Sequence, residues 1–182
     1  MALKSEITFR RTWAMPNKWT FSIKPIAELL DRYVGDGKGW VDPFAGKLSP
    51  AEMTNDMSED SIATWHLDAF DFVDCLDGQV FNGCLFDPPY SMEQIARSYK
   101  SVGKSSKLAY TKDAFCDPTG SFKKVKDEIG RRVIPGGLVI CFGWNSNGFG
   151  KGRGFVMIDG LVVAHGGHHN DTIVTVEMKV RV

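Results

Sequence analysis

Short apolar runs of strand length alternate in this sequence with segments of helical periodicity, and clusters of Gly, Pro or Asp separate them. This alternation is typical of an α/β fold, in which helices join the strands of a mostly parallel sheet. We expect strands at residues 39–41, 51–55, 80–86, 138–142, 161–164 and 172–179. We expect helices at residues 25–34, 68–76 and 122–133. The last two strands are joined by a turn-rich connection, which predicts an antiparallel hairpin at the C-terminal edge of the sheet.

The length and composition indicate one ordinary globular domain over residues 1–182. Hydrophobic residues are 43% and charged residues 24%, a balance that excludes a disordered or fibrous chain. The apolar runs are far shorter than the ~20 residues that cross a bilayer, and the N-terminus has no apolar signal segment, so no membrane partner is expected. Four cysteines without a C-x-x-C pair suggest reduced thiols in a cytoplasmic protein.

The net charge of zero conceals two segments of opposite sign. Residues 42–77 carry nine acidic side chains and one basic side chain, whereas residues 97–132 carry ten basic and four acidic side chains. Such a pattern fits a cationic ligand on the acidic segment and an anionic partner on the basic one. Solvated charged faces would produce the same pattern, and charge alone does not separate the two interpretations.

The tetrapeptide Asp87-Pro88-Pro89-Tyr90 directly follows the apolar strand expected at 80–86. Ligands of open α/β sheets bind just outside the carboxyl ends of the strands. There, the Asp87 carboxylate and the Pro88 carbonyl can accept hydrogen bonds from an exocyclic amino group, while Tyr90 stacks on the ring that carries it. The alternative is a strand exit that is merely stiffened by prolines.

This motif and four other segments resemble those of the amino-methyltransferases that use S-adenosylmethionine (SAM) to methylate N6 of adenine in DNA, in particular a compact, phage-type subgroup. The segments, together covering roughly residues 17–90, are Thr20–Pro25, Asp42-Pro43-Phe44-Ala45-Gly46, Asn55-Asp56, His66-Leu67-Asp68-Ala69 and Asp87–Tyr90. The resemblance implies a class I Rossmann-like methyltransferase sheet with SAM as the cofactor. It also implies a protein of the bacterial cytoplasm, in a phage-infected or prophage-carrying cell.

The resemblance also assigns roles to single residues. Asp87, Pro88 and Tyr90 would be catalytic. Asp56 would hold the ribose hydroxyls of SAM, and Asp68 would accept from its adenine amino group, although both acids could instead cap a helix or a turn. The full set expected at the cofactor is Phe21, Lys24, Asp42, Phe44, Gly46, Asp56, Asp68 and Ala69.

DNA is the expected partner, and the target base would flip out of the duplex to reach the pocket. The side chains expected to contact nucleic acid are Arg97, Lys100, Lys104, Lys107, Asn145, Lys151 and Arg153. The sequence shows no separate target-recognition domain. We therefore expect any recognition of the DNA sequence to come from residues 91–120, a long basic loop with some helix near 93–99. Association into a homodimer is left open.

Two departures from the family pattern concern the cofactor segment. The turn at Ala45-Gly46-Lys47 lacks a second glycine, and the next strand follows too soon for a crossover helix. This shortened segment leaves open a non-catalytic module that binds SAM or nucleic acid. A further alternative, within the same enzyme class, is methylation of cytosine N4 or of RNA adenine. His165, His168 and His169 lack a fourth ligand, and we expect no metal site.

Overall fold

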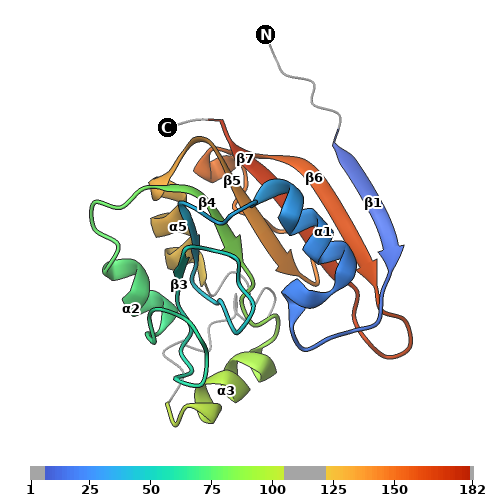
Figure 1. The fold of residues 1–182 in the computed structure, drawn as a ribbon, viewed down its shortest axis with the longest axis horizontal. Helices are drawn as coiled ribbons and strands as arrows, with labels where there is room; N and C mark the ends of the chain where they lie inside the picture. Colours follow the sequence, from blue (N-terminus) through green and yellow to red (C-terminus); the bar gives the residue numbers. More distant parts are fainter. Residues whose placement is uncertain (1–6, 105–121, 181–182) are drawn as a thin grey trace.

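Residues 7–104 and 122–180 are described in a computed structural model, where they form a seven-stranded sheet with helices on both faces (Figure 1). The strands are β1 (Thr8–Trp13), β2 (Trp40–Asp42), β3 (Met53–Thr54), β4 (Phe81–Phe86), β5 (Val133–Gly143), β6 (Phe155–Ala164) and β7 (Thr172–Lys179). The helices are α1 (Lys24–Tyr33), α2 (Ala69–Asp74), α3 (Met92–Ser101) and α5 (Lys123–Arg132), with the short 3-10 turns η1 (Thr20–Ser22) and η3 (Lys151–Arg153).

The order of the strands is β1-β6-β7-β5-β4-β2-β3. Strand β7 runs antiparallel to both β5 and β6, and the other neighbours pair in parallel. The predicted fold class, a mostly parallel sheet with a C-terminal antiparallel hairpin, is therefore confirmed. In the described part of the chain, no helix is long and apolar enough to span a bilayer.

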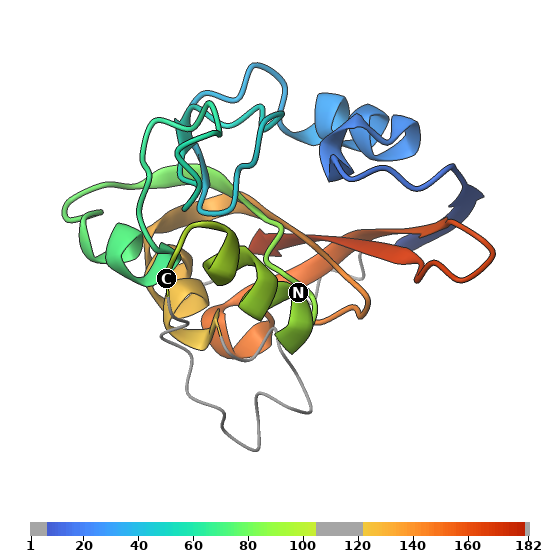
Figure 2. The ribbon, with the colours of Figure 1, turned by 90° about the horizontal axis from the view of Figure 1, so that it is seen from below.

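The alternation of side chains along the central strands divides the core into two layers. Leu85 of β4 packs with α1 on one face, whereas Cys84 and Phe86 pack with α2, α3 and α5 on the other. Figure 2 shows α1 on one side of the sheet and α5 on the opposite side. Both faces of the central strands are thus covered, which leaves the ends of the strands as the place where a ligand can approach them.

The helix expected near residues 93–99, inside the long basic loop expected at 91–120, is present as α3. Ser91 caps it, because its hydroxyl accepts a hydrogen bond from the Gln94 backbone N–H at 3.1 Å. Ile95 and Tyr99 lie four residues apart and are both buried against the core. The helix is slightly longer than the stretch expected near 93–99, because the Ser91 cap and the buried pair Ile95 and Tyr99 stabilise it.

The edge strand β1 is the largest departure from the expected elements. It pairs in parallel with β6, and the buried carboxylate of Asp159 in β6 anchors it. That carboxylate accepts hydrogen bonds from Arg10 at 2.7 Å and from the Tyr33 hydroxyl of α1 at 2.9 Å. Strands β5 and β6 also begin earlier than expected, at Val133 and Phe155. These contacts join segments that lie far apart in the chain, so short-range patterns could not reveal them.

Candidate cofactor and acceptor site

A cavity of about 450 Å³ lies at the carboxyl ends of β2, β3 and β4. Its volume is within the range of ordinary small-molecule sites. The predicted site residues that line it are Phe44, Asp56, Ala69, Asp87, Pro88, Tyr90 and Arg97. Lining residues that the sequence did not single out include Thr20, Asn55, Gln94, Tyr99 and Phe122. Catalytic and cofactor candidates from three strand ends thus meet in one cavity.

Asp87, Tyr90 and Thr20 form a hydrogen-bonded group in the cavity wall. The Tyr90 hydroxyl donates to the Asp87 carboxylate, and the Thr20 side chain hydrogen-bonds to both residues. Burial raises the pKa of Asp87 to about 6, while the bonds from Tyr90 and Thr20 act in the opposite direction. Burial, followed by the adjacent Asp87 charge, raises the pKa of Tyr90, so this residue stays protonated and donates.

Tyr90 is held both at its backbone and at its ring. Its backbone N–H donates to the Gln94 side-chain carbonyl of α3 at 2.6 Å. The ring also lies against the end of β5, where the Trp144 and Tyr90 ring centroids are 5.7 Å apart. The two prolines before Tyr90 fix φ and limit the ways in which this turn can relax. The turn therefore presents Asp87 and Tyr90 in one defined arrangement.

Asp42 lies beneath the cavity rather than in its wall. Its carboxylate accepts from the Ser49 hydroxyl at 2.6 Å and from the Phe44 backbone N–H at 2.9 Å. Burial raises its pKa to about 7; these two hydrogen bonds lower the pKa, and the nearby charges of Asp87 and Asp56 raise it further. Asp42 thus shapes the turn that carries Phe44.

Asp56 holds the same turn from its other end. One carboxylate oxygen accepts from the Gly46 backbone N–H at 2.9 Å, and the other accepts from the Ser58 N–H at 2.7 Å. Gly46 has φ of +55°, a conformation that favours glycine, although its N–H points to Asp56 and it does not line the cavity. Because Asp56 itself lines the cavity, its carboxylate can still accept hydrogen bonds from a ligand.

Asn55 joins three loops of the site, and sequence reasoning gave it no role beyond its place in the Asn55-Asp56 segment. Its side-chain amide donates to the carbonyls of Pro43 at 3.1 Å and Leu67 at 3.0 Å. Its side-chain oxygen accepts from the Leu67 N–H. The residue is fully buried, and its position at the end of the expected strand 51–55 is the signal that could have identified it.

Asp68 is the N-cap of α2 and does not line the cavity. One of its oxygens accepts from the Phe70 N–H at 3.0 Å, and the other accepts from the Tyr99 hydroxyl of α3 at 2.5 Å. The neighbouring Ala69 does line the cavity. The capping role weighed for Asp68 is thus observed, whereas its predicted role toward the cofactor stays a prediction.

Of the expected closing element, only Thr20 reaches the cavity. Phe21 instead packs on Phe142, with ring centroids 5.1 Å apart, and Lys24 is exposed at the start of α1. The sequence predicted the correct segment, but Phe21 and Lys24 were chosen in place of their neighbour Thr20. The 3-10 turn η1 directs Thr20 toward Asp87 and Tyr90.

The candidate nucleic-acid contacts are dispersed. Arg97 lines the cavity and forms a surface ion pair with Glu93, and Lys100 and Lys104 are exposed at the end of α3. Lys107 lies outside the described residues. These residues still predict a basic surface beside the cavity.

The three candidates that follow β5 differ in how free they are. Asn145 and Lys151 are exposed. The Arg153 guanidinium instead bonds to the Asp127 carboxylate at 2.7 Å and the Phe149 carbonyl at 2.9 Å. Arg153 therefore fastens η3 to α5.

The histidines do not form a metal site in the described part of the chain. The buried His165 ring bonds to the Ala14 carbonyl and the Thr172 hydroxyl, both at 2.9 Å. Over residues 7–104 and 122–180, no group of three or more His, Cys, Asp or Glu side chains could hold a metal ion. His165 instead tethers the segment that runs from β1 toward η1.

Similar architectures occur among solved methyltransferase structures. TrmN from Thermus thermophilus matches with a TM-score of 0.52 and 16% identity, over 87% of this chain and 49% of TrmN. The N-methyltransferase NodS from Bradyrhizobium japonicum, in complex with S-adenosylhomocysteine (SAH), matches with a TM-score of 0.52 and 10% identity, over 87% of both chains. The 1,6-didemethyltoxoflavin-N1-methyltransferase of Burkholderia thailandensis, with its substrate and SAH bound, matches with a TM-score of 0.54 and 13% identity, over 87% of this chain and 78% of that one.

This chain has a Rossmann-like methyltransferase fold. It spans about half the length of TrmN. No protein-family model matches the sequence, and no curated protein sequence matches it significantly. At 10–16% identity, these similarities show the fold, and the chemistry must be argued from the residues of the cavity.

The raised pKa of Asp42 predicts a pH-dependent difference in stability. In the folded protein Asp42 ionises near pH 7, but in the unfolded chain near pH 4, so its ionisation destabilises the fold progressively across that interval. Replacing Asp42 by a neutral isostere, Asp42→Asn, should remove this pH-dependent fall in the free energy of unfolding. Urea unfolding should show the variant gaining up to about 4 kcal/mol relative to wild type between about pH 4 and pH 7. Parallel pH profiles for the two proteins would contradict this assignment.

Proposed function

We propose that the protein is a SAM-dependent methyltransferase that transfers a methyl group to the exocyclic N6 of adenine in DNA. The observation that carries this proposal is that Asp87, Pro88 and Tyr90 line the same cavity as Asp56 and Ala69. Residues that can accept from amino N–H groups therefore line the same cavity as a carboxylate that can accept from ribose hydroxyls. The similar structures support methyl transfer to nitrogen, because two of them are N-methyltransferases crystallised with SAH.

The cavity residues fit SAM by chemistry as well as by volume. Asp56 offers carboxylate oxygens for two ribose hydroxyls, and Phe44, Leu67 and Phe122 offer apolar surface for a purine ring. SAM would supply an electrophilic methyl group on a sulfonium. The carboxylates around the cavity favour that positive charge electrostatically.

Asp87 and Pro88 would act on the acceptor. The lone pair of an aromatic amino group is delocalised into the ring, which makes it a weak nucleophile. Two N–H groups that donate to the Asp87 carboxylate and the Pro88 carbonyl would localise this pair on nitrogen and aim it at the methyl carbon. The amino nitrogen would form its bond to the methyl carbon as the C–S bond of SAM breaks, the sulfur would keep that electron pair as the thioether of SAH, and the surplus proton of the amino group would pass to solvent.

The Tyr90 hydroxyl already donates a hydrogen bond to the Asp87 carboxylate. An acceptor amino group must share or displace this hydrogen bond, while the Tyr90 ring remains available for stacking on the base. The bond keeps Asp87 ionised near neutral pH before the acceptor arrives, because it lowers a pKa that burial raises.

Transfer of labelled methyl groups tests the proposal. Purified protein and labelled SAM are incubated separately with plasmid DNA and with an RNA transcript. Nucleoside mass spectrometry should then find labelled N6-methyl-2′-deoxyadenosine in the DNA. Asp87→Asn should lower turnover by at least about 10²–10³, the scale for one preorganised electrostatic contact. The exposed Asp31→Asn on α1 is the matched control and should keep full activity.

The outcomes of this assay separate the alternatives. Label on cytosine N4 or on RNA would show that the acceptor assigned here is wrong, while the assignment as a SAM-dependent methyltransferase would stand. No label on either nucleic acid, with SAM bound, would overturn the proposed function.

The Tyr90 hydroxyl and ring should have separable effects. Tyr90→Phe keeps the ring, so turnover at pH 8 should stay near that of wild type. In the wild-type protein the Tyr90 hydrogen bond lowers the pKa of Asp87, so its removal should raise that pKa. The acid limb of the kcat/KM profile should therefore move from about pH 6 to higher pH. Tyr90→Ala should lose binding of the acceptor at every pH. An unshifted acid limb in Tyr90→Phe would mean that Asp87 does not control it.

A further inference from the structure

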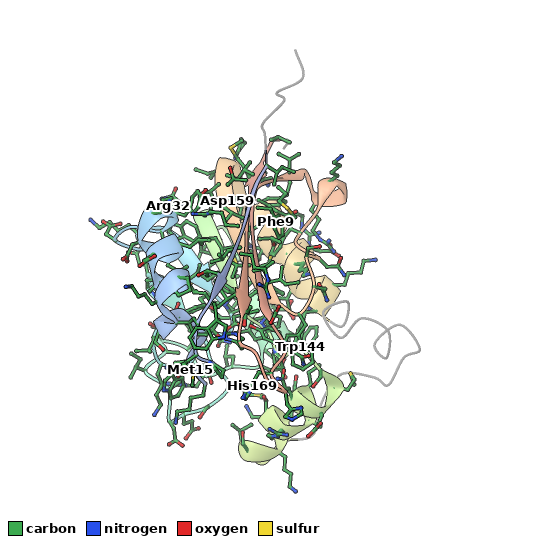
Figure 3. All side chains as sticks on the ribbon, turned by 90° about the vertical axis from the view of Figure 1, so that its right-hand side faces the viewer. Phe9, Met15, Arg32, Trp144, Asp159 and His169 are labelled. Atoms are coloured by element: carbon green, nitrogen blue, oxygen red, sulfur yellow. The ribbon has the colours of Figure 1, made fainter. Side chains whose placement is uncertain are left out.

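The side chain of Trp144, a large aromatic residue next to the site, is exposed although nothing in the packing of the fold requires this. It directly follows β5, the strand that pairs with β4, and β4 ends immediately before Asp87. Its side chain is 40% exposed, and it belongs to neither of the two core layers. Figure 3 shows Trp144 toward the end of the sheet where α3 lies. Its position thus places an exposed indole ring beside the cavity wall.

Trp144 contacts the side chain that is expected to stack on the acceptor. The ring planes of Trp144 and Tyr90 meet at 61°, with their centroids 5.7 Å apart. The Tyr90 ring also lies over Gly143, where an added Cβ would be 4.0 Å from Tyr90 Cδ1. Tyr90 is therefore supported by the end of β5, and the two rings form an open aromatic corner.

We propose that Trp144 and Tyr90 together hold the acceptor ring, and that Trp144 restricts the acceptor to planar heteroaromatic rings. This inference rests on the proposed function, which it deepens. A planar ring placed against one wall of a 61° corner meets the other wall with its edge, and both arrangements are favourable for aromatic pairs. The amino group of such a ring would then point to Asp87, which bonds to Tyr90.

The corner also fits a base that has left a duplex. Stacking on aromatic side chains replaces the base–base stacking that is lost when a nucleotide flips out or stays single-stranded. A neutral aliphatic amine, the form that can accept a methyl group, has no π-face to stack on the indole. The corner therefore accounts for selectivity among amines in a way that Asp87 alone cannot, because any amino group can donate to a carboxylate.

Equilibrium binding tests this proposal independently of catalysis. The probe is a fluorescein-labelled single-stranded oligonucleotide that contains adenine, titrated at constant salt and followed by anisotropy in the presence of SAH. Trp144→Ala should weaken its binding about tenfold or more, the scale for losing one stacked base. Trp144→Phe should retain most of the affinity, because it keeps an aromatic face. Calorimetric affinity for SAH should change less than twofold.

Trp13→Ala is the matched control, because Trp13 is 61% exposed on β1 at the opposite edge of the sheet from β3. It should bind the oligonucleotide as wild type does. Equal losses in the two alanine variants, or no loss in Trp144→Ala, would overturn the role of Trp144. Normal methyl transfer together with an unchanged acceptor KM in Trp144→Ala would also overturn it, while leaving the proposed function intact. Oligonucleotide binding that depends on Trp144, together with no methyl transfer by the wild-type protein, would overturn the proposed function and leave the role of Trp144 intact.

Discussion

Parallel pairing of β2 with β4 is the constraint on which the site depends. It brings the carboxyl ends of the two strands to one edge, where β2 ends at Asp42 before a proline and β4 is followed by Asp87 and a proline. The fully buried Asp42 is thereby held close enough to Asp87, in the cavity wall, for the charge of Asp87 to raise the pKa of Asp42. The fold tolerates this cost because backbone and hydroxyl donors serve both groups: Phe44 and Ser49 for Asp42, Tyr90 and Thr20 for Asp87. A positively charged ligand would further reduce the repulsion between the Asp42 and Asp87 carboxylates.

The parts of this arrangement that the sequence predicts are local. An apolar run that ends in Asp-Pro-Pro-Tyr indicates a strand end, and the chemistry of the tetrapeptide follows from its side chains wherever the strand lies. The placement of Asp56 and Ala69 in the same cavity follows in turn from the parallel sheet, since such strands end at one edge. The cavity could therefore be predicted from short-range patterns together with one rule of topology.

The parts that the sequence does not predict depend on contacts between distant segments. Strand β1 pairs along its whole length with the distant strand β6, where Arg10 meets the buried Asp159. The apolar residues of β1 do not alternate with polar ones in the pattern of a covered strand. Thr20 and Trp144 reach the site only because η1 and the end of β5 fold toward Tyr90. No spacing along the chain connects these residues, so only the folded structure brings them together.

The crystal structure of the protein with SAH is the measurement that tests the account most directly. The account predicts SAH in the cavity between β2 and α3, with its ribose hydroxyls on Asp56 and its sulfur turned toward Asp87 and Tyr90. Methyl transfer to an amino group held by Asp87 requires that orientation. SAH bound at another surface, such as the hollow beside Trp65 and Val80, or with its sulfur turned away from Asp87, would contradict it.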